Sequence, residues 1–216
     1  MIVIRSFDVN KPGEDAENLK GGVAGGTILK GVLKVGDEVE IRPGITRKDF
    51  QTGQISWTHI TTRITSLKAD ENQLMYAVPG GLIGVGLTVD PYITRTDRMV
   101  GMILGHPGKL PEVALEIDVQ FYLLIRLLGV KTEGDNAKVQ KLKVDEMLMI
   151  NIGSTSLGGK IASIKSDIAK IQFLSPVCAN LGDKIAISRK IVRNFRLIGW
   201  GEIKKTYSQK TITGSS

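Results

Sequence analysis

Apolar and polar residues alternate with a period of two along much of the chain, which predicts strands. Val39 and Ile41 alternate with Glu40 and Arg42, and residues 113–121 repeat the pattern. Period two places successive side chains on opposite faces of a strand, so each segment has one apolar face for a core. Clusters of glycine, asparagine and proline separate the segments, as tight turns require. The pattern predicts an all-β protein.

The stretch from Gly21 to Gly44 is the most specific of these patterns. A glycine-rich apolar run passes through Gly36 and Asp37 into the alternating strand that contains Val39. Glycine and aspartate adopt the positive φ that hairpin turns need. We therefore expect two strands joined as a hairpin by this turn, and a further hairpin tip around Gly53.

The second half of the chain is predicted to form its own set of strands. They are expected at 113–121, 146–152, 161–164, 168–174, 185–188 and 196–203. Residues 122–128 are compatible with a long bent strand and with a short helix. The charged segment 132–143 predicts a surface loop, and 161–164 is expected to pair with 168–174.

A turn at Gly105-His106-Pro107-Gly108 marks the predicted domain boundary. It follows a strand expected at 99–104 and interrupts the alternating pattern. We predict one domain at 1–107, a second at 108–206, and a polar tail at 207–216 that we expect to be mobile.

Basic residues exceed acidic ones, with 29 Lys and Arg against 22 Asp and Glu and a formal net charge of +7. This excess of positive charge favours polyanionic partners, although many basic domains bind no polyanion. The basic residues cluster late in the chain, where Phe195 and Trp200 lie among them. They are either solvated strand ends or a patch that contacts phosphates. We expect the two aromatic side chains to lie in the core. The late basic residues are Arg189, Lys190, Arg193, Arg196, Lys204 and Lys205.

Several functional classes are disfavoured. Cys178 is the single cysteine, so it forms no intramolecular disulfide, and we interpret it as a core residue in a reducing, cytoplasmic protein. We interpret His59 and His106 as structural or surface residues. No run approaches the ~18–20 apolar residues of a membrane span, and the N-terminus does not resemble a signal peptide. We expect no membrane partner.

Two glycine-rich segments approach a phosphate-binding loop without matching it. Gly26–Gly31 has the four-residue spacing, but Val32 and Leu33 stand where Lys and Ser or Thr are required. Gly153–Lys160 places its lysine one position too late, between two predicted strands, and no helix follows to receive an anion. We predict that the chain is not an enzyme and holds no cofactor or metal ion itself.

Seven segments in order carry a closer match to a known family. They are MIVIRSFDVNKP at 1–12, the stretch 21–44, residues 77–90 with PGGLIGVG, DRMVG at 97–101, LLGVKTEG at 127–134, MINIGS at 149–154 and RLIGWG at 196–201. Together they resemble the gamma subunit of eukaryotic and archaeal translation initiation factor two. The resemblance implies two consecutive antiparallel β-barrels of the translational-GTPase type, like domains two and three of elongation factor Tu.

The resemblance also implies a non-catalytic role. The phosphate loop, switch regions and guanine-binding motif of the family do not occur in these 216 residues, so GTP and magnesium are implied for a GTPase domain outside them. Met1 then corresponds to an internal methionine of a longer subunit. The implied function is to help bind and position methionyl-initiator tRNA for start-codon selection on the small ribosomal subunit, and to dock partner subunits.

The resemblance distributes the partners over the domains. It implies that the first barrel grips the acceptor end of the tRNA and receives the alpha subunit, that the beta subunit uses the GTPase domain, and that an assembly chaperone binds the second barrel. A shallow apolar pocket for the terminal adenosine needs close backbone approach, which glycine permits. Its candidate residues are Thr27, Leu29, Gly80, Gly81, Leu82, Gly84 and Val85. The candidates for contacts to RNA or the ribosome are Arg95, Arg98, Arg126 and Arg193.

The alternative interpretation is a protein-only assembly module. In it, the chain docks the alpha subunit or the chaperone without direct RNA contact, and its basic charge is incidental.

Overall fold

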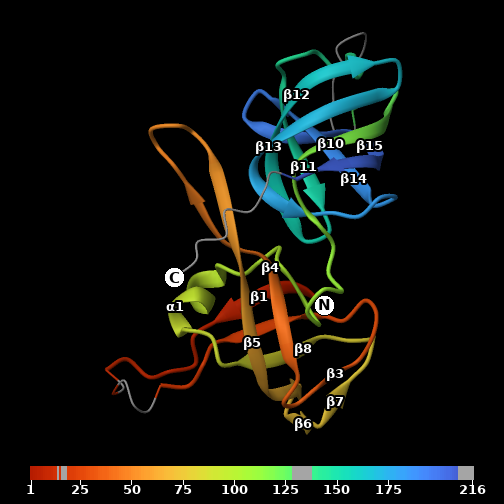
Figure 1. Ribbon diagram of the computed structural model, residues 1–216. Helices are drawn as coiled ribbons and strands as arrows, with labels where there is room; N and C mark the ends of the chain where they lie inside the picture. The colour runs from red at the N-terminus through yellow and green to blue at the C-terminus, as the bar shows by residue number, and fades with distance from the viewer. Residues whose placement is uncertain (14, 16–18, 128–137, 209–216) are drawn as a thin grey trace. The chain divides into compact units, whose positions relative to one another are not determined.

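The computed structural model describes residues 1–13, 15, 19–127 and 138–208 of the chain. Its contacts divide these residues into two compact units. One contains Met1–Arg47 and Trp57–Leu110, and the other contains Lys48–Ser56 and the described residues from Pro111 onward. The predicted limits of 1–107 and 108–206 stay a prediction, since this division does not follow chain order. Each unit contains one β-barrel (Figure 1).

The first barrel is formed by strands from the N-terminal half. These are β1 (Ile2–Phe7), β2 (Val23–Thr27), β3 (Leu33–Lys34), β4 (Glu38–Lys48), β5 (Ile55–Ala69), β6 (Asn72–Leu74), β7 (Tyr76–Ala77), β8 (Ile83–Leu87) and β9 (Ile103–Gly105). Six of them follow one another in the order β4-β9-β1-β2-β8-β5, and pairing of β4 with β5 closes the barrel. β6 extends the sheet beside β5, while β3 and β7 form a separate ribbon. A short helix α1 (Pro91–Thr94) and a 3₁₀ turn η2 (Arg95–Asp97) connect β8 to β9.

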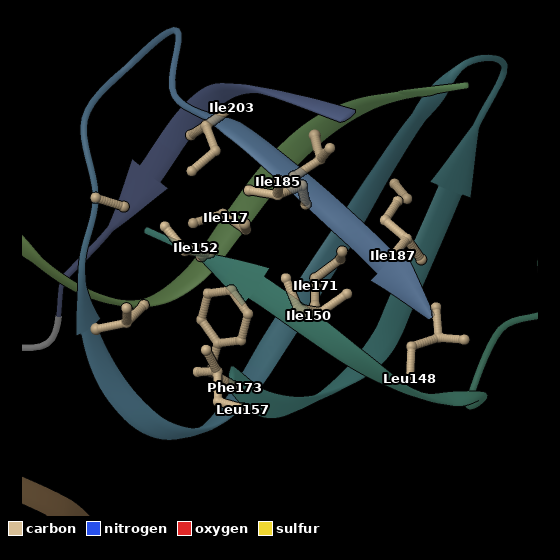
Figure 2. Packing of buried hydrophobic residues seen from close by; sticks show 14 of the residues in the cluster. Ile117, Leu148, Ile150, Ile152, Leu157, Ile171, Phe173, Ile185, Ile187 and Ile203 are labelled. Carbon is tan, nitrogen blue, oxygen red and sulfur yellow. The ribbon is translucent and has the colours of Figure 1, made fainter. Parts of the chain in front are cut away.

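The second barrel is a closed six-stranded sheet. Its strands are β10 (Val113–Leu123), β11 (Met147–Ile152), β12 (Thr155–Lys165), β13 (Ile168–Cys178), β14 (Lys184–Ile191) and β15 (Asn194–Tyr207), in the order β10-β13-β12-β11-β14-β15. Alternate residues point inward, and Figure 2 shows Ile150, Ile171, Ile187 and Phe173 meeting in the interior. The prediction of an all-β fold with two antiparallel barrels is confirmed.

The turn within residues 21–44 is present, but the predicted hairpin is wrong. Gly36 has a φ of +92°, and the N–H of Asp37 donates to the carbonyl of Lys34 at 3.2 Å. The flanking strands nevertheless pair elsewhere: β2 with β1 and β8, β3 with β7, and β4 with β9 and β5. A turn sets the local direction of the chain, whereas closure of the barrel decides which strands become neighbours.

Other hairpins are confirmed. The turn after β4 is held by hydrogen bonds from the N–H of Asp49 to the carbonyl of Gln54 and from the N–H of Gly53 to the carbonyl of Asp49, at 2.9 and 2.8 Å. β12 pairs with β13 across 166–167, as predicted. β11 pairs with β12 across the turn at 153–154, and β12 therefore begins at Thr155, before the predicted limit of 161. These pairings are local, so the short turns suffice to predict them.

Some element limits differ from the predictions. The strand expected at 99–104 begins only at Ile103, because the residues before it form turns held by hydrogen bonds such as that from the N–H of Val100 to the carbonyl of Asp97, 3.1 Å. β10 continues as a strand to Leu123, and no helix follows in the described residues 124–127. Residues 128 and 132–137 lie outside the described residues, as does the predicted tail from 209 onward.

Three side chains near the C-terminus also depart from expectation. Tyr207, predicted to begin the tail, ends β15, and its hydroxyl donates to Asp118 Oδ2 at 2.6 Å. Phe195 and Trp200, predicted to lie in the core, are 48% and 44% exposed. Both lie on the outward face of β15, because the register of the strand assigns the inward positions to residues such as Ile203. Cys178 is buried, as predicted.

Candidate binding groove on the first barrel

A groove with a volume of about 700 Å³ lies on the first barrel. Its lining residues come from β1, β2, β8 and β5, which are neighbours in the sheet, and from the segments that flank them. Segments distant in the sequence therefore contribute to one surface. Glycines line its floor, apolar side chains its walls, and basic side chains occur among them.

Two glycines form part of the floor, Gly25 of β2 and Gly84 of β8, which lie directly opposite each other; Gly25 is buried and Gly84 is half-buried. Neither has a left-handed φ, and a Cβ added to either would meet no atom closer than 3.7 Å. By contrast, a Cβ on Gly26 would collide with the carbonyl oxygen of Ile2. Among the glycines in the described part of the chain, only Gly25 and Gly84 combine an ordinary φ with room for a side chain. The barrel does not need glycine at these two positions, so the bare floor is a feature of the surface itself.

The walls combine apolar and charged groups, in which three basic residues outnumber the single acidic residue, Asp70. Phe7 and Leu82 are exposed apolar residues of the lining, and Arg5, Lys20 and Lys68 supply positive charge. Basic side chains beside an apolar floor suit a ligand that carries both a flat apolar part and negative charge.

The Arg5 side chain is held in place by Asp97. Its Nε lies 3.0 Å from Asp97 Oδ1, which also accepts a hydrogen bond from the N–H of Ser6 at 2.9 Å. That backbone hydrogen bond, followed by the one from Arg5, lowers the pKa of Asp97 below its ordinary value. The carboxylate therefore stays charged near neutral pH and restrains the guanidinium at the groove.

Two of the predicted pocket residues, Leu82 and Gly84, line this groove. Val85 does not, since the period of two along β8 turns its side chain into the core, where it is fully buried. Leu29 is exposed in the segment that follows β2. These placements leave the predicted roles untested.

Gly80 and Gly81 lie in the connection between β7 and β8, and Thr27, the last residue of β2, contacts this connection. Thr27 Oγ1 donates to the carbonyl oxygen of Gly81 at 3.1 Å. Gly80 and Gly81 have φ values of +126° and +70°, which the turn requires. This contact ties the end of β2 to the loop that carries Leu82.

Several groove residues were missed by the sequence predictions. Arg5, Phe7 and Val9 follow one another at every second position, which is the signal that they share a face. Gly25 and Lys68 join them only through strand pairing. Spacing alone could not show that these segments contribute to one groove.

The four basic candidates lie at separate places. Arg95 is exposed in η2, and Arg98 lies over the ring of Tyr92, with its Cζ 3.9 Å from the ring centroid. Arg126 follows β10 and forms an isolated bridge with Lys138, while Arg193 is exposed in the turn between β14 and β15. Within each barrel these residues are accessible, and their predicted contacts stay untested.

A buried ionic cluster holds the segment after β9 on the first barrel. Glu40 accepts hydrogen bonds from Arg42 Nε at 2.9 Å and from the N–H of Gly108 at 3.2 Å, and His59 Nδ1 lies 2.8 Å from it. Arg42 also donates to the carbonyl of Leu110 at 3.4 Å. Burial raises the pKa of Glu40, but the hydrogen bonds from Arg42 and Gly108 outweigh it, and the net pKa is lowered. His59 is thus part of a structural cluster.

The two glycine-rich segments 26–31 and 153–160 do not fit a nucleotide phosphate site. Gly26 and Thr27 end β2, and the segment after them carries no helix whose N-terminus could receive an anion. Gly158, Gly159 and Lys160 lie within β12. The two glycine-rich segments are parts of strands and turns.

Known protein families match both units of the chain. The family described as "Elongation factor Tu domain 2" matches residues 21–105, and the family described as "Initiation factor eIF2 gamma, C terminal" matches residues 115–203. "Eukaryotic translation initiation factor 2 subunit 3" of Drosophila melanogaster is 55% identical over 215 residues, which are 99% of this chain. The chain belongs to the gamma family of translation initiation factor 2. It spans 44% of the length of that relative, and the matched regions correspond to the non-GTPase part of the gamma family.

Membership of the gamma family places the chain among translation initiation factors. In the described part of the chain, no helix has the length and apolar character needed to cross a lipid bilayer.

Proposed function

We propose that this chain is the non-catalytic part of an initiation factor 2 gamma subunit that helps bind and position methionyl-initiator tRNA for start-codon selection on the small ribosomal subunit. In this proposal, the groove of the first barrel receives the terminal nucleoside of the tRNA. The observation that carries the proposal is the bare floor at Gly25 and Gly84 with cationic side chains around it.

The chemistry of the groove suits a nucleoside at the end of a strand. A flat base can lie against the half-buried backbone of Gly84, where no Cβ intervenes, and the Phe7 ring offers a surface for stacking. The phosphates of the preceding nucleotides then lie near Arg5, Lys20 or Lys68, which supply affinity without reading sequence. Specificity for the initiator tRNA comes from other contacts.

The remaining partners are proposed from the family. The first barrel also receives the alpha subunit, the beta subunit binds through a GTPase domain, and an assembly chaperone binds the second barrel. Arg95, Arg98, Arg126 and Arg193 face RNA or the ribosome. The protein acts in the cytoplasm. GTP and magnesium belong to the GTPase domain, whose motifs this chain does not carry, and this chain contributes positioning.

The experiment measures binding of fluorescently labelled methionyl-initiator tRNA to this chain at several salt concentrations. In this proposal the GTPase domain supplies half of the tRNA-binding surface. We therefore expect this chain alone to bind the tRNA weakly and in a salt-sensitive way. Gly84→Val, which fills the floor, is expected to weaken binding at least tenfold without lowering the melting temperature. Lys68→Glu is expected to weaken it and to reduce the slope of log K against log salt by about one.

Matched controls separate the groove from general effects. Lys165→Glu changes the same charge on β12 of the other barrel and is expected to leave the tRNA affinity within twofold. Tight binding that does not change with salt, or equal binding by Gly84→Val and the wild type, would overturn the proposal.

The protein-only alternative makes a different prediction. Replacing Arg95, Arg98, Arg126 and Arg193 with glutamate abolishes association with tRNA or ribosome in the RNA-binding proposal, while binding of the alpha subunit or the chaperone persists. If this variant retains full RNA association, the RNA-facing assignment of these arginines is wrong. The alternative is then favoured if the wild-type chain binds no initiator tRNA at all.

A further inference from the structure

An apolar stripe runs along the outside of β15 in the second barrel. Phe195, Leu197 and Trp200 are 48%, 40% and 44% exposed. They belong to one strand, and a bulge at Ile198 keeps all three on its outward face. Three large apolar side chains in line on one outer face form a surface of the kind that partners bind.

The register with β14 shows what borders this stripe. Ala186 lies opposite Trp200 and Ser188 lies opposite Leu197, so small side chains leave the flank of the stripe open. A lysine of β14 lies at each end of the stripe. Lys190 lies opposite Phe195, and Lys184 lies opposite Glu202, the next outward-facing residue after Trp200. The two lysines are six residues apart, which is about 20 Å along a strand.

Both faces of the Trp200 ring are already occupied. On the β10 side, the Tyr122 ring stacks on Trp200 with centroids 4.5 Å apart and an interplanar angle of 24°. On the β14 side, Lys184 Nζ lies over the Trp200 ring, 5.2 Å from its centroid. A base needs a free ring face for stacking. Leu197 has no ring, so Phe195 is the one residue of the stripe left for stacking, and a run of successive bases has no second ring there. The stripe therefore suits apolar protein side chains better than nucleic acid.

The charge around the stripe is strongly positive. Residues 184–205 carry seven Lys and Arg and one acidic residue, Glu202. Glu202 lies within ion-pair distance of both Lys184 and Lys204. Arg189 is held by Glu146. The remaining excess of positive charge calls for an acidic partner.

We propose that this stripe is a docking site for an acidic amphipathic segment of another protein. The segment places apolar side chains on Phe195, Leu197 and Trp200 and a carboxylate near Lys190, since Lys184 is already paired with Glu202. A helix that spans about 20 Å has about 13 residues, with anchors spaced three or four residues apart. The proposal does not rest on the tRNA groove, since that groove lies on the other barrel.

The experiment selects peptides of 16 residues from a random phage-displayed library against this chain, with Leu197→Ser as the counter-selection target. Expected peptides combine several Asp or Glu with apolar residues at helical spacing. Binding of synthesised peptides is then measured in a Trp57→Phe background, where Trp200 is the sole tryptophan. Its fluorescence is expected to shift to the blue as the peptide covers it.

Variants test the site. Leu197→Ser and Lys190→Glu are each expected to weaken peptide binding at least tenfold. Leu174→Ser on β13 and Lys165→Glu on β12 are the matched controls and are expected to change it less than twofold. If Leu197→Ser fails to fold, Ser188→Arg at the flank replaces it as the test.

Three outcomes overturn the proposal. The first is selection of basic or featureless peptides, and the second is peptide binding that Leu197→Ser leaves unchanged. The third is binding of a single-stranded oligouridine that Leu197→Ser abolishes and the selected peptides do not displace, which would assign the surface to nucleic acid. None of these results bears on binding of tRNA in the groove.

Discussion

Glu40 is the residue whose removal should destabilise the first barrel most clearly through electrostatics. The side chains of Glu40 and Arg42 are 10% and 13% exposed, and Glu40 also binds His59 and the N–H of Gly108. Glu40→Ala leaves a nearly buried guanidinium without its carboxylate and removes the acceptor for a backbone N–H.

The magnitude follows from these contacts. Removing one partner of a buried ion pair costs about 3–5 kcal/mol. Arg42 keeps its bond to the carbonyl of Leu110, so we expect the lower end, about 3 kcal/mol. For a domain of roughly 100 residues this corresponds to a fall in melting temperature of roughly 10–20 °C. Glu38→Ala, an exposed glutamate on the same strand, is expected to change stability by less than about 0.5 kcal/mol.

The pH dependence gives an independent check. The pKa of Glu40 is lowered in the fold, so its carboxylate contributes stability above the ordinary glutamate pKa of about 4.3, and this contribution is lost as pH falls through the folded-state value. The stability difference between wild type and Glu40→Gln should therefore be largest at neutral pH and shrink below about pH 4.

Urea unfolding followed by circular dichroism at several pH values measures both effects. A loss below about 1 kcal/mol for Glu40→Ala at pH 7, or a difference from Glu40→Gln that does not change with pH, would refute the reasoning.

Three further predictions concern other parts of the chain. Gly26→Ala should cost about 2–4 kcal/mol in urea unfolding, since its Cβ meets the Ile2 carbonyl, whereas Gly25→Ala should cost less than about 1 kcal/mol; equal costs would contradict the assigned packing. Phe173→Ala should destabilise the second barrel by about 3–5 kcal/mol, and Leu174→Ala, which is exposed next to it, by under about 1 kcal/mol; a reversed order would show that the register of β13 is wrong. The pKa of Glu202 is lowered to about 2 by Lys184 and Lys204. Lys184→Met should raise it toward about 4.3 in a carboxyl NMR titration, and an unchanged value would rule out that pairing.

Much of the fold could be read from local patterns. Period two in residues 113–121 and 168–174 predicts strands because a strand with one buried face needs that alternation. The hairpins at 153–154 and 166–167 are predictable because their partners are neighbours in sequence. Sequence segments such as 21–44 also identified the family, and the comparisons with known proteins confirm it.

The candidate site was only partly predictable. Leu82 and Gly84 were named, whereas Arg5, Phe7 and Gly25 were not. The missing information was the pairing of β2 with both β1 and β8, which places the three segments on one surface. Spacing along one strand says which residues share a face, but it does not say which other strand supplies the opposite wall.

By itself, the sequence determined the strands, the short turns, the family and the excess of positive charge. Only the tertiary structure decided that the strands around Gly36 are not partners, that Val85 faces inward, and that Phe195 and Trp200 face outward. The physical reason is that alternation marks two faces of a strand without saying which one meets the core. Closure of each barrel makes that choice, because it fixes which neighbours every strand has and which of its faces they enclose.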